Sequence, residues 1–263
     1  LAQLDAGKLK EWGKLLKTGS IKVHPGKDAD AIRSEHPPER FLESRFVKTR
    51  RDDPENPGET ELKCRWCIKG FLDPDLFDLQ RQSPTLSMEG LAVCLQIIAS
   101  CKWRLVIADV EGAFLQGEPL AREQGRLFVK IPKEGIPKCD PNDVVEVLKC
   151  VYGLVDAPRA WWVSFSNTLK TLGMKQSELD PCVFYWHHEG VLEGCISLHV
   201  DDMVIGGTDR FHQMVLGPLK QRYPFKHWKI GGGMFLGKQL KQNEDFPFFV
   251  IKKNMRKKFK RSN

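Results

Sequence analysis

The most informative stretch of the chain is Cys195-Ile196-Ser197-Leu198-His199-Val200-Asp201-Asp202-Met203-Val204-Ile205-Gly206-Gly207. Apolar residues alternate before the two acids and resume directly after them, a pattern typical of strand, tight turn and strand. Two adjacent carboxylates beside apolar strands are costly to bury unless a cation lies there. Mg²⁺ prefers carboxylate and phosphate oxygens, so the turn is a candidate metal site; ordinary turn chemistry is the plain alternative.

A second acid stands in a matching context. Trp103–Asp109 is an apolar, β-branched run that predicts a strand ending in Asp109, and Val110–Leu115 predicts a turn into a short helix. If the two strands lie side by side, their carboxylates converge. Acids arranged in this way hold two metal ions about 3.5–4 Å apart, which clamp the attacking and leaving oxygens of a phosphoryl transfer.

Five motifs together resemble one known family. Residues 108–117 (ADVEGAFLQG) are similar to its LDVKNAFLNG, residues 151–162 (VYGLVDAPRAWW) to LYGLKQAPRAWY, and residues 199–202 (HVDD) to YVDD. Ser83-Pro84 resembles its FSPV, and Phe235-Leu236-Gly237 its FLGI. The order and spacing agree between about residues 45 and 240, and on these motifs the chain resembles the reverse transcriptases of copia-type retrotransposons.

The resemblance implies an α+β fold of the fingers–palm kind, with an antiparallel palm sheet, helices packed on one face, and a thumb that is missing or truncated. The implied organisation is an N-terminal helical and loop extension over 1–44, fingers over 45–100, and a palm over 101–240 with fingers segments interleaved. A basic tail over 241–263 follows.

The resemblance also implies an RNA-directed DNA polymerase. A primer 3′-hydroxyl would attack an incoming deoxynucleoside triphosphate on an RNA or DNA template. Mg²⁺ (or Mn²⁺) would be held by Asp109, Asp201 and Asp202, with the backbone carbonyl of Val110 as a further ligand. The implied location is intracellular, in a cytoplasmic particle, in the nucleus or in both.

Residues that contact the nucleotide can be expected as well. Lys63, Arg65 and Lys69 would meet the triphosphate, because Arg and Lys bind phosphate by charge-assisted hydrogen bonds. The resemblance places the ring of Phe114 beneath the sugar, where it would exclude a 2′-hydroxyl; a plain core role is the alternative.

Two positions depart from the family pattern. Asp156 replaces a Gln that is thought to touch template or nucleotide, and as a helix N-cap Asp is the better residue. His199 replaces a Tyr. These departures leave open a catalytically decayed, nucleic-acid-binding remnant. An unrelated two-metal nuclease would not require the segment 151–162.

Other patterns predict the remaining elements. We expect a helix over 1–20 with Leu4, Leu9, Trp12 and Leu16 roughly on one face, and a loop over 21–43. We expect a basic hairpin from strands 46–51 and 62–68, a helix capped by Ser87, and strands over 128–132 and 144–148. A helix from Asp156 to Gly173 completes the set.

Composition sets further bounds. The 263 residues are 41% hydrophobic and contain no apolar run of a membrane span's length. The net charge is +7, and residues 252–261 contain seven Lys and Arg residues. The remaining 34 basic residues balance the 34 acidic ones, so this segment carries the whole excess of positive charge. Cys64 and Cys67 form one half of a zinc site without a second half, so we expect reduced cysteines. The missing initiator Met predicts a piece of a longer polyprotein.

Overall fold

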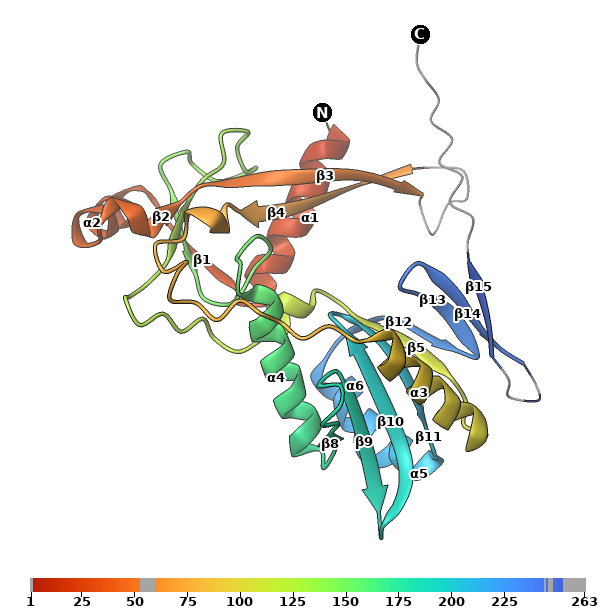
Figure 1. Ribbon diagram of the computed structural model, residues 1–263. Helices are drawn as coiled ribbons and strands as arrows, with labels where there is room; N and C mark the ends of the chain where they lie inside the picture. The colour runs from red at the N-terminus through yellow and green to blue at the C-terminus, as the bar shows by residue number, and fades with distance from the viewer. Residues whose placement is uncertain (1, 53–59, 244, 246–247, 253–263) are drawn as a thin grey trace. The chain divides into compact units, whose positions relative to one another are not determined.

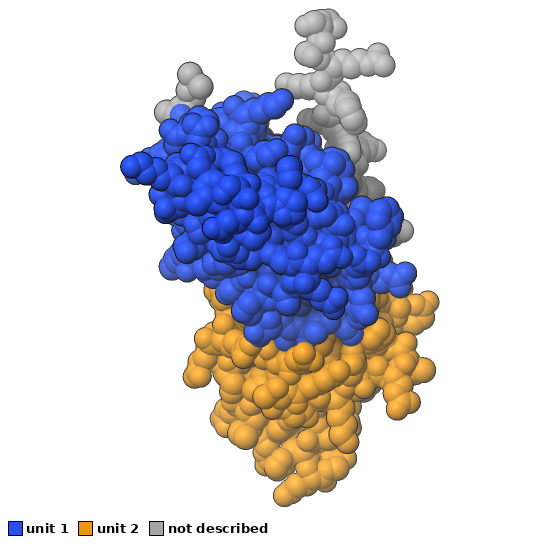
Figure 2. Space-filling view, turned by 90° about the vertical axis from the view of Figure 1, so that its left-hand side faces the viewer, with its two compact units in different colours: residues 1–83, 113–165 blue, residues 84–112, 166–263 orange. Residues whose placement is uncertain are grey.

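The structure, a computed structural model, describes residues 2–52, 60–243, 245 and 248–252. The chain forms two compact units from interleaved segments: a first unit of residues 1–83 and 113–165, and a second unit of residues 84–112 and 166–263 (Figure 2). Helices and mostly antiparallel strands occur in both, which confirms the predicted α+β class. The division into fingers, palm and tail at residues 44, 100 and 240 stays a prediction.

The first unit contains a four-stranded sheet and a separate hairpin (Figure 1). The sheet has the order β1-β7-β6-β2, and the hairpin pairs β3 with β4. The elements of the first unit are α1 (Ala2–Lys17), β1 (Ile21–His24), α2 (Gly26–Glu35), η1 (Pro38–Arg40), β2 (Phe41–Leu42), β3 (Ser44–Asp52), β4 (Thr60–Ile68), η2 (Gly70–Leu72), η3 (Ala113–Gln116), β6 (Phe128–Lys130), β7 (Val144–Val147) and the start of α4 (Ala157–Thr171).

The second unit is built on a six-stranded antiparallel sheet with the order β12-β5-β11-β10-β9-β8. A smaller sheet, β13-β14-β15, accompanies it. The elements are α3 (Met88–Ser100), β5 (Val106–Val110), β8 (Lys175–Gln176), β9 (Val183–His188), β10 (Val191–His199), β11 (Asp202–Gly207), α5 (Asp209–Phe211), η4 (His212–Leu216), α6 (Gly217–Arg222), β12 (Phe225–Ile230), β13 (Gly232–Phe235), β14 (Lys238–Gln242) and β15 (Phe248–Lys252).

Most of the predicted elements are confirmed. The hairpin β10–β11, the basic hairpin β3–β4 and the strands β6 and β7 lie where their patterns indicate. Ser87 caps α3 by accepting a hydrogen bond from the Gly90 N–H at 2.9 Å. The helix α4 ends at Thr171, and Gly173 follows with φ +83°. The strand predicted over 103–109 is shorter at its start, because β5 begins at Val106.

For the N-terminal region, one expectation is wrong and a second is right only in part. The loop expected over 21–43 contains β1, α2, η1 and β2. The helix α2 has only two buried residues, Ala29 and Ile32, among mostly polar ones, so its sequence shows no clear apolar periodicity. The apolar face predicted for α1 is right for Trp12, which is buried, and for Leu4, which packs against the core. It is wrong for Leu9 and Leu16, which are 37% and 46% exposed, whereas Leu15 is fully buried. The buried face of α1 also includes Lys8, whose ammonium donates to the Glu134 carbonyl at 2.8 Å. A polar residue on a buried face interrupts the apolar periodicity from which the face is predicted.

The expectation that helices cover one face of the palm sheet is also wrong. Ile98 of α3 packs over Gly206, and Phe211 of α5 packs over the next residue, Gly207. Because successive strand residues point to opposite faces, helices cover both faces (Figure 1). The cause is visible in β10 and β11, where Gly194–Leu198 and Met203–Gly206 are continuously buried and need cover on both sides.

A glycine joins the hairpin of the first unit to the segment before α4. Gly153 has φ +98°, and an added Cβ would lie 2.0 Å from the Ile68 carbonyl oxygen at the end of β4. The Ile68 N–H donates to the Tyr152 carbonyl at 2.9 Å. The glycine of the Tyr-Gly-Leu motif is therefore required by the close approach of the two backbones, and the hydrogen bond holds Tyr152 beside β4. In the described part of the chain, every helix is too short or too polar to cross a bilayer.

Candidate active site

Two of the three predicted catalytic acids lie directly opposite each other. The strands β5 and β11 are neighbours at the centre of the sheet, and their register pairs Asp109 with Asp202. Residues in such a pair have Cα atoms about 4.5–5.5 Å apart. Asp201 comes just before β11, and its carbonyl accepts from the Val110 N–H at 3.0 Å. The end of β5 is therefore tied by the backbone to the tip of the hairpin.

The hairpin turn is strained at one residue. His199 pairs with Asp202, so the turn consists of Val200 and Asp201. Val200 has φ +57°, a left-handed conformation that is a genuine outlier for a β-branched residue. Such strain concentrates at functional sites. The predicted strand, tight turn and strand are confirmed, and Asp201 is exposed at the tip.

The three carboxylates share one electrostatic environment. The pKa of Asp202 is raised to about 6: partial burial is the largest cause, the charges of Asp201 and Asp109 add to it, and Lys226 opposes it. The Lys226 Nζ lies 3.4 Å from the Asp109 Oδ2. Lys226 was not predicted, since its position 24 residues after Asp202 carries no sequence motif.

A divalent cation fits these residues by the chemistry of the donors. Carboxylate oxygens are the ligands that Mg²⁺ prefers, and three clustered negative charges favour a cation among them. The side chains of the described residues nevertheless do not converge as a ready group of three or more metal ligands. The ligand set of Asp109, Asp201, Asp202 and the Val110 carbonyl therefore stays a prediction.

Two predicted nucleotide contacts of the first unit meet at one aromatic ring. The Arg65 guanidinium lies 5.3 Å from the centre of the Tyr152 ring. The ring of Phe114 meets the same ring edge-on, at 5.4 Å between centroids. Lys63 lies two residues before Arg65 in β4 and so points to the same face. Tyr152 itself was missed, although it belongs to the motif at 151–162.

Lys69 is engaged elsewhere. Its ammonium forms an ion pair with the Glu43 carboxylate, and that hydrogen bond lowers the pKa of Glu43. Both residues line a hollow of about 340 Å³ together with Arg45, Lys130 and Lys133. This part of the first unit is therefore basic apart from Glu43 and Glu134.

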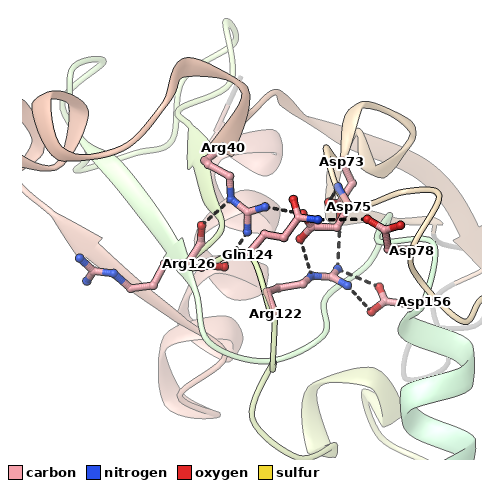
Figure 3. A network of polar contacts seen from close by, with 9 residues as sticks. Arg40, Asp73, Asp75, Asp78, Arg122, Gln124, Arg126 and Asp156 are labelled. Atoms are coloured by element: carbon pink, nitrogen blue, oxygen red, sulfur yellow. Dashed lines mark hydrogen bonds and ion pairs between the residues drawn. The ribbon is translucent and has the colours of Figure 1, made fainter.

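Asp156 belongs to a buried polar network (Figure 3). The Arg122 Nη1 donates to the Asp156 Oδ2 at 2.9 Å, and the Arg122 Nη2 donates to the Asp73 Oδ2 at 3.0 Å. Burial raises the pKa of Asp73, and the Arg122 charge opposes that rise. Asp156 is the N-cap residue of α4, and its backbone carbonyl accepts from the Ala160 N–H. The side chain is thus held by Arg122, a partner 34 residues away that no local pattern indicates.

Comparison with known proteins decides the family. The family model of "Reverse transcriptase (RNA-dependent DNA polymerase)" matches residues 34–259. The chain belongs to this reverse transcriptase family. Its curated relatives make it a copia-type reverse transcriptase domain of retrotransposon Pol polyproteins, as the resemblance implied.

Three relatives illustrate the likeness. The chain is 32% identical over 62% of its length to the Pol polyprotein from transposon RE1 of Arabidopsis thaliana. It is 31% identical over 56% to that from transposon TNT 1-94 of Nicotiana tabacum, and 26% identical over 76% to the Ty1-DR1 Gag-Pol polyprotein of Saccharomyces cerevisiae. The matches span 11% of each relative. A foamy viral protease–reverse transcriptase solved with double-stranded DNA is similar at a TM-score of 0.46, with 13% identity over 86% of this chain and 32% of that chain.

Proposed function

We propose that this reverse transcriptase domain is an active RNA-directed DNA polymerase that works by two-metal nucleotidyl transfer. The observation that carries the proposal is the register of the central strands, which sets Asp109 opposite Asp202 beside a strained turn that exposes Asp201. Divalent ions, when bound, neutralise charge on the transferring phosphate and favour the ionised nucleophile. Asp109, Asp201 and Asp202 would hold them, with the Val110 carbonyl as a further ligand.

The acids of the second unit have separate tasks in this proposal. Asp109 and Asp202 face each other from paired strands, so each provides carboxylate oxygens from a rigid position. Asp201 lies in the turn directly after the strained Val200 and is exposed at the tip of the hairpin. The reaction joins the primer 3′-oxygen to the α-phosphorus and releases pyrophosphate.

The first unit supplies the proposed nucleotide contacts. Arg65 and Lys63 of β4 offer cationic donors for the triphosphate, and Lys69 would have to leave Glu43 to join them. The partly buried ring of Phe114 would lie beneath the sugar and exclude a 2′-hydroxyl by clash. Asp156 would act on the nucleotide only through Arg122, because its carboxylate is already bonded there. The partners are a primed RNA or DNA template and deoxynucleoside triphosphates.

Primer extension tests the proposal. The chain is incubated with a labelled primer on an RNA template and deoxynucleotides, with Mg²⁺ or with EDTA, and the product lengths are measured. We expect Mg²⁺-dependent lengthening that Asp109→Asn reduces by at least about 100-fold, while Asp209→Asn, an exposed acid of the same unit, stays near the parent. Equal extension by Asp109→Asn contradicts the mechanism.

The same assay separates the alternatives. A catalytically decayed remnant, suggested by Asp156 and His199, would bind the primed template and leave the primer unchanged. A nuclease would shorten the primer. A sugar-selection arm compares ribonucleotide with deoxynucleotide addition for Phe114→Val, and the ratio should rise only if Phe114 is the steric gate.

A further inference from the structure

An irregularity in β12 directs a lysine toward the acidic cluster. This edge strand pairs with β5, and the register shifts between Phe225, opposite Val110, and His227, opposite Asp109. Lys226 is therefore the extra residue of a β-bulge. Bulges are over-represented next to active sites, where they turn a side chain away from its regular direction. Here the Lys226 ammonium comes to 3.4 Å from the Asp109 Oδ2.

Packing on both sides of Lys226 holds the bulge in place. The Glu111 N–H donates to the Pro224 carbonyl at 2.8 Å, which ties the start of β12 to the end of β5. Trp228 contacts Phe225 edge-on at 5.0 Å and carries the Lys220 ammonium 3.6 Å from its ring centre. The backbone at Lys226 is thus fixed, whereas its side chain is 41% exposed and can turn into solvent.

We propose that Lys226 is a built-in counterion that occupies the Asp109 carboxylate and competes with a divalent cation for it. This inference rests on the metal site of the proposed function. An ammonium and a metal ion that share one carboxylate repel each other, so binding of one disfavours the other. A lysine suits this task because its charge is a point on a flexible stem and can leave without moving the strand. Lys226 would then keep the acidic cluster balanced until a cation replaces it.

The test measures Mn²⁺ binding to the whole chain by the electron paramagnetic resonance signal of free Mn²⁺. Lys226→Met should bind Mn²⁺ about 2- to 5-fold more tightly than the parent, the size expected for a half-exposed ion pair. Lys226→Arg keeps the charge and should stay near the parent. Lys229→Met is the matched control, because this exposed lysine of the same strand lies opposite Ile107 rather than a carboxylate.

A second readout needs no metal. In EDTA, Lys226→Met should lower the urea midpoint of unfolding, because the carboxylates lose their counterion. The same change in an Asp109→Asn background should have little effect, since the paired charge is already gone. Unchanged or weaker Mn²⁺ binding by Lys226→Met overturns the proposal, as does an equal gain in Lys229→Met.

The Asp109→Asn variant separates this inference from the proposed function. If Asp109→Asn binds Mn²⁺ like the parent, no metal site includes Asp109, and both proposals fail. If Asp109→Asn loses binding while Lys226→Met matches the parent, the metal site stands and only the counterion role is wrong. Loss of binding in Asp109→Asn together with tighter binding in Lys226→Met supports both.

Discussion

Val200 shows at the scale of one residue how the hairpin exposes Asp201. Its φ of +57° is unfavourable for a β-branched side chain, and positions of this kind cost roughly 1–3 kcal/mol. The strands on either side pair without interruption, so the sheet forces the turn into this conformation. The sequence pattern predicts the turn but not the positive φ. Glycine is the residue that usually marks a positive φ, and this position holds Val.

Replacing Val200 tests this strain. Val200→Gly should raise the free energy of unfolding by about 0.5–1 kcal/mol, because relief of strain exceeds the entropy that glycine adds to the unfolded chain. Urea denaturation measures the change. Val200→Ala, which keeps a Cβ at positive φ, should gain less. If Val200→Gly is destabilised by about 1 kcal/mol or more, the positive φ of Val200 does not strain the turn.

Asp202 carries a second prediction because its pKa is raised to about 6 from an ordinary value of 3.8. A carboxyl that binds its proton more tightly in the folded state loses folding free energy as the pH rises from about 4 to 6, and the deficit persists above that range. Asp202→Asn should therefore be more stable than the parent at pH 8, by about 1 kcal/mol or less because partial exposure screens the charge. At pH 3.5 the two proteins should differ little.

Thermal unfolding at the two pH values measures this difference. Asp209→Asn, an exposed acid of the same unit, should show no such pH-dependent gain. A stability difference for Asp202→Asn that is equal at pH 3.5 and pH 8 would mean that the raised pKa of Asp202, caused by burial and by the charges of Asp201 and Asp109, is not its source.

At the scale of the elements, long-range partners decide what local patterns leave open. Periodicity correctly places the hairpins β3–β4 and β10–β11 and the helices α3 and α4, because each has a clean apolar period and a recognisable cap or turn. It fails for residues 21–43, where β1, α2 and β2 are short and mostly polar. It also fails for Arg122 and Lys226, whose partners are far apart in the chain.

The network around Arg122 gives the prediction at this scale. Arg122→Met removes the cation from between Asp73 and Asp156, which are 0% and 14% exposed. Leaving buried charges without their partner costs about 3–5 kcal/mol, and urea denaturation should show a loss of this size. Asp156→Gln, the residue typical of the family, should cost only about 1 kcal/mol because its carbonyl can still accept from Arg122.

The neighbouring Arg126 is the matched control for that experiment. Its side chain is 49% exposed, so Arg126→Met should change the free energy of unfolding by less than about 1 kcal/mol. A loss below 1 kcal/mol for Arg122→Met itself would show that the network does not hold this part of the first unit together.

At the scale of the whole molecule, the chain alternates between its two units. Residues 84–112 bring α3 and β5 into the second unit, and residues 113–165 return to the first. The motif at 108–117 crosses this boundary, so Asp109 belongs to the second unit and Phe114 to the first. The division at residues 44, 100 and 240 that the resemblance implies already places fingers segments within 101–240, and its boundaries stay a prediction.

The basic tail supplies a prediction for the whole molecule. Its residues 253–263 lie outside the described part of the chain. If it binds nucleic acid, changing Lys253, Arg256, Lys257, Lys258, Lys260 and Arg261 to Gln should weaken binding of primed duplex and flatten its salt dependence. Each lost phosphate contact changes the slope of log K against log salt by about 0.9. Fluorescence anisotropy at KCl concentrations from about 50 to about 300 mM measures this slope. An unchanged slope means that the tail makes no phosphate contacts.

In the proposed mechanism, Asp109, Asp201 and Asp202 form one metal site at the end of the β5–β11 pair. The most direct measurement is the anomalous scattering of Mn²⁺ in crystals of the chain with primed template and a non-hydrolysable deoxynucleotide. We expect a peak at roughly 2.0–2.2 Å from carboxylate oxygens of Asp109 and of at least one hairpin acid. A peak bound only elsewhere, or Asp109 turned away from an ordered metal, would contradict it.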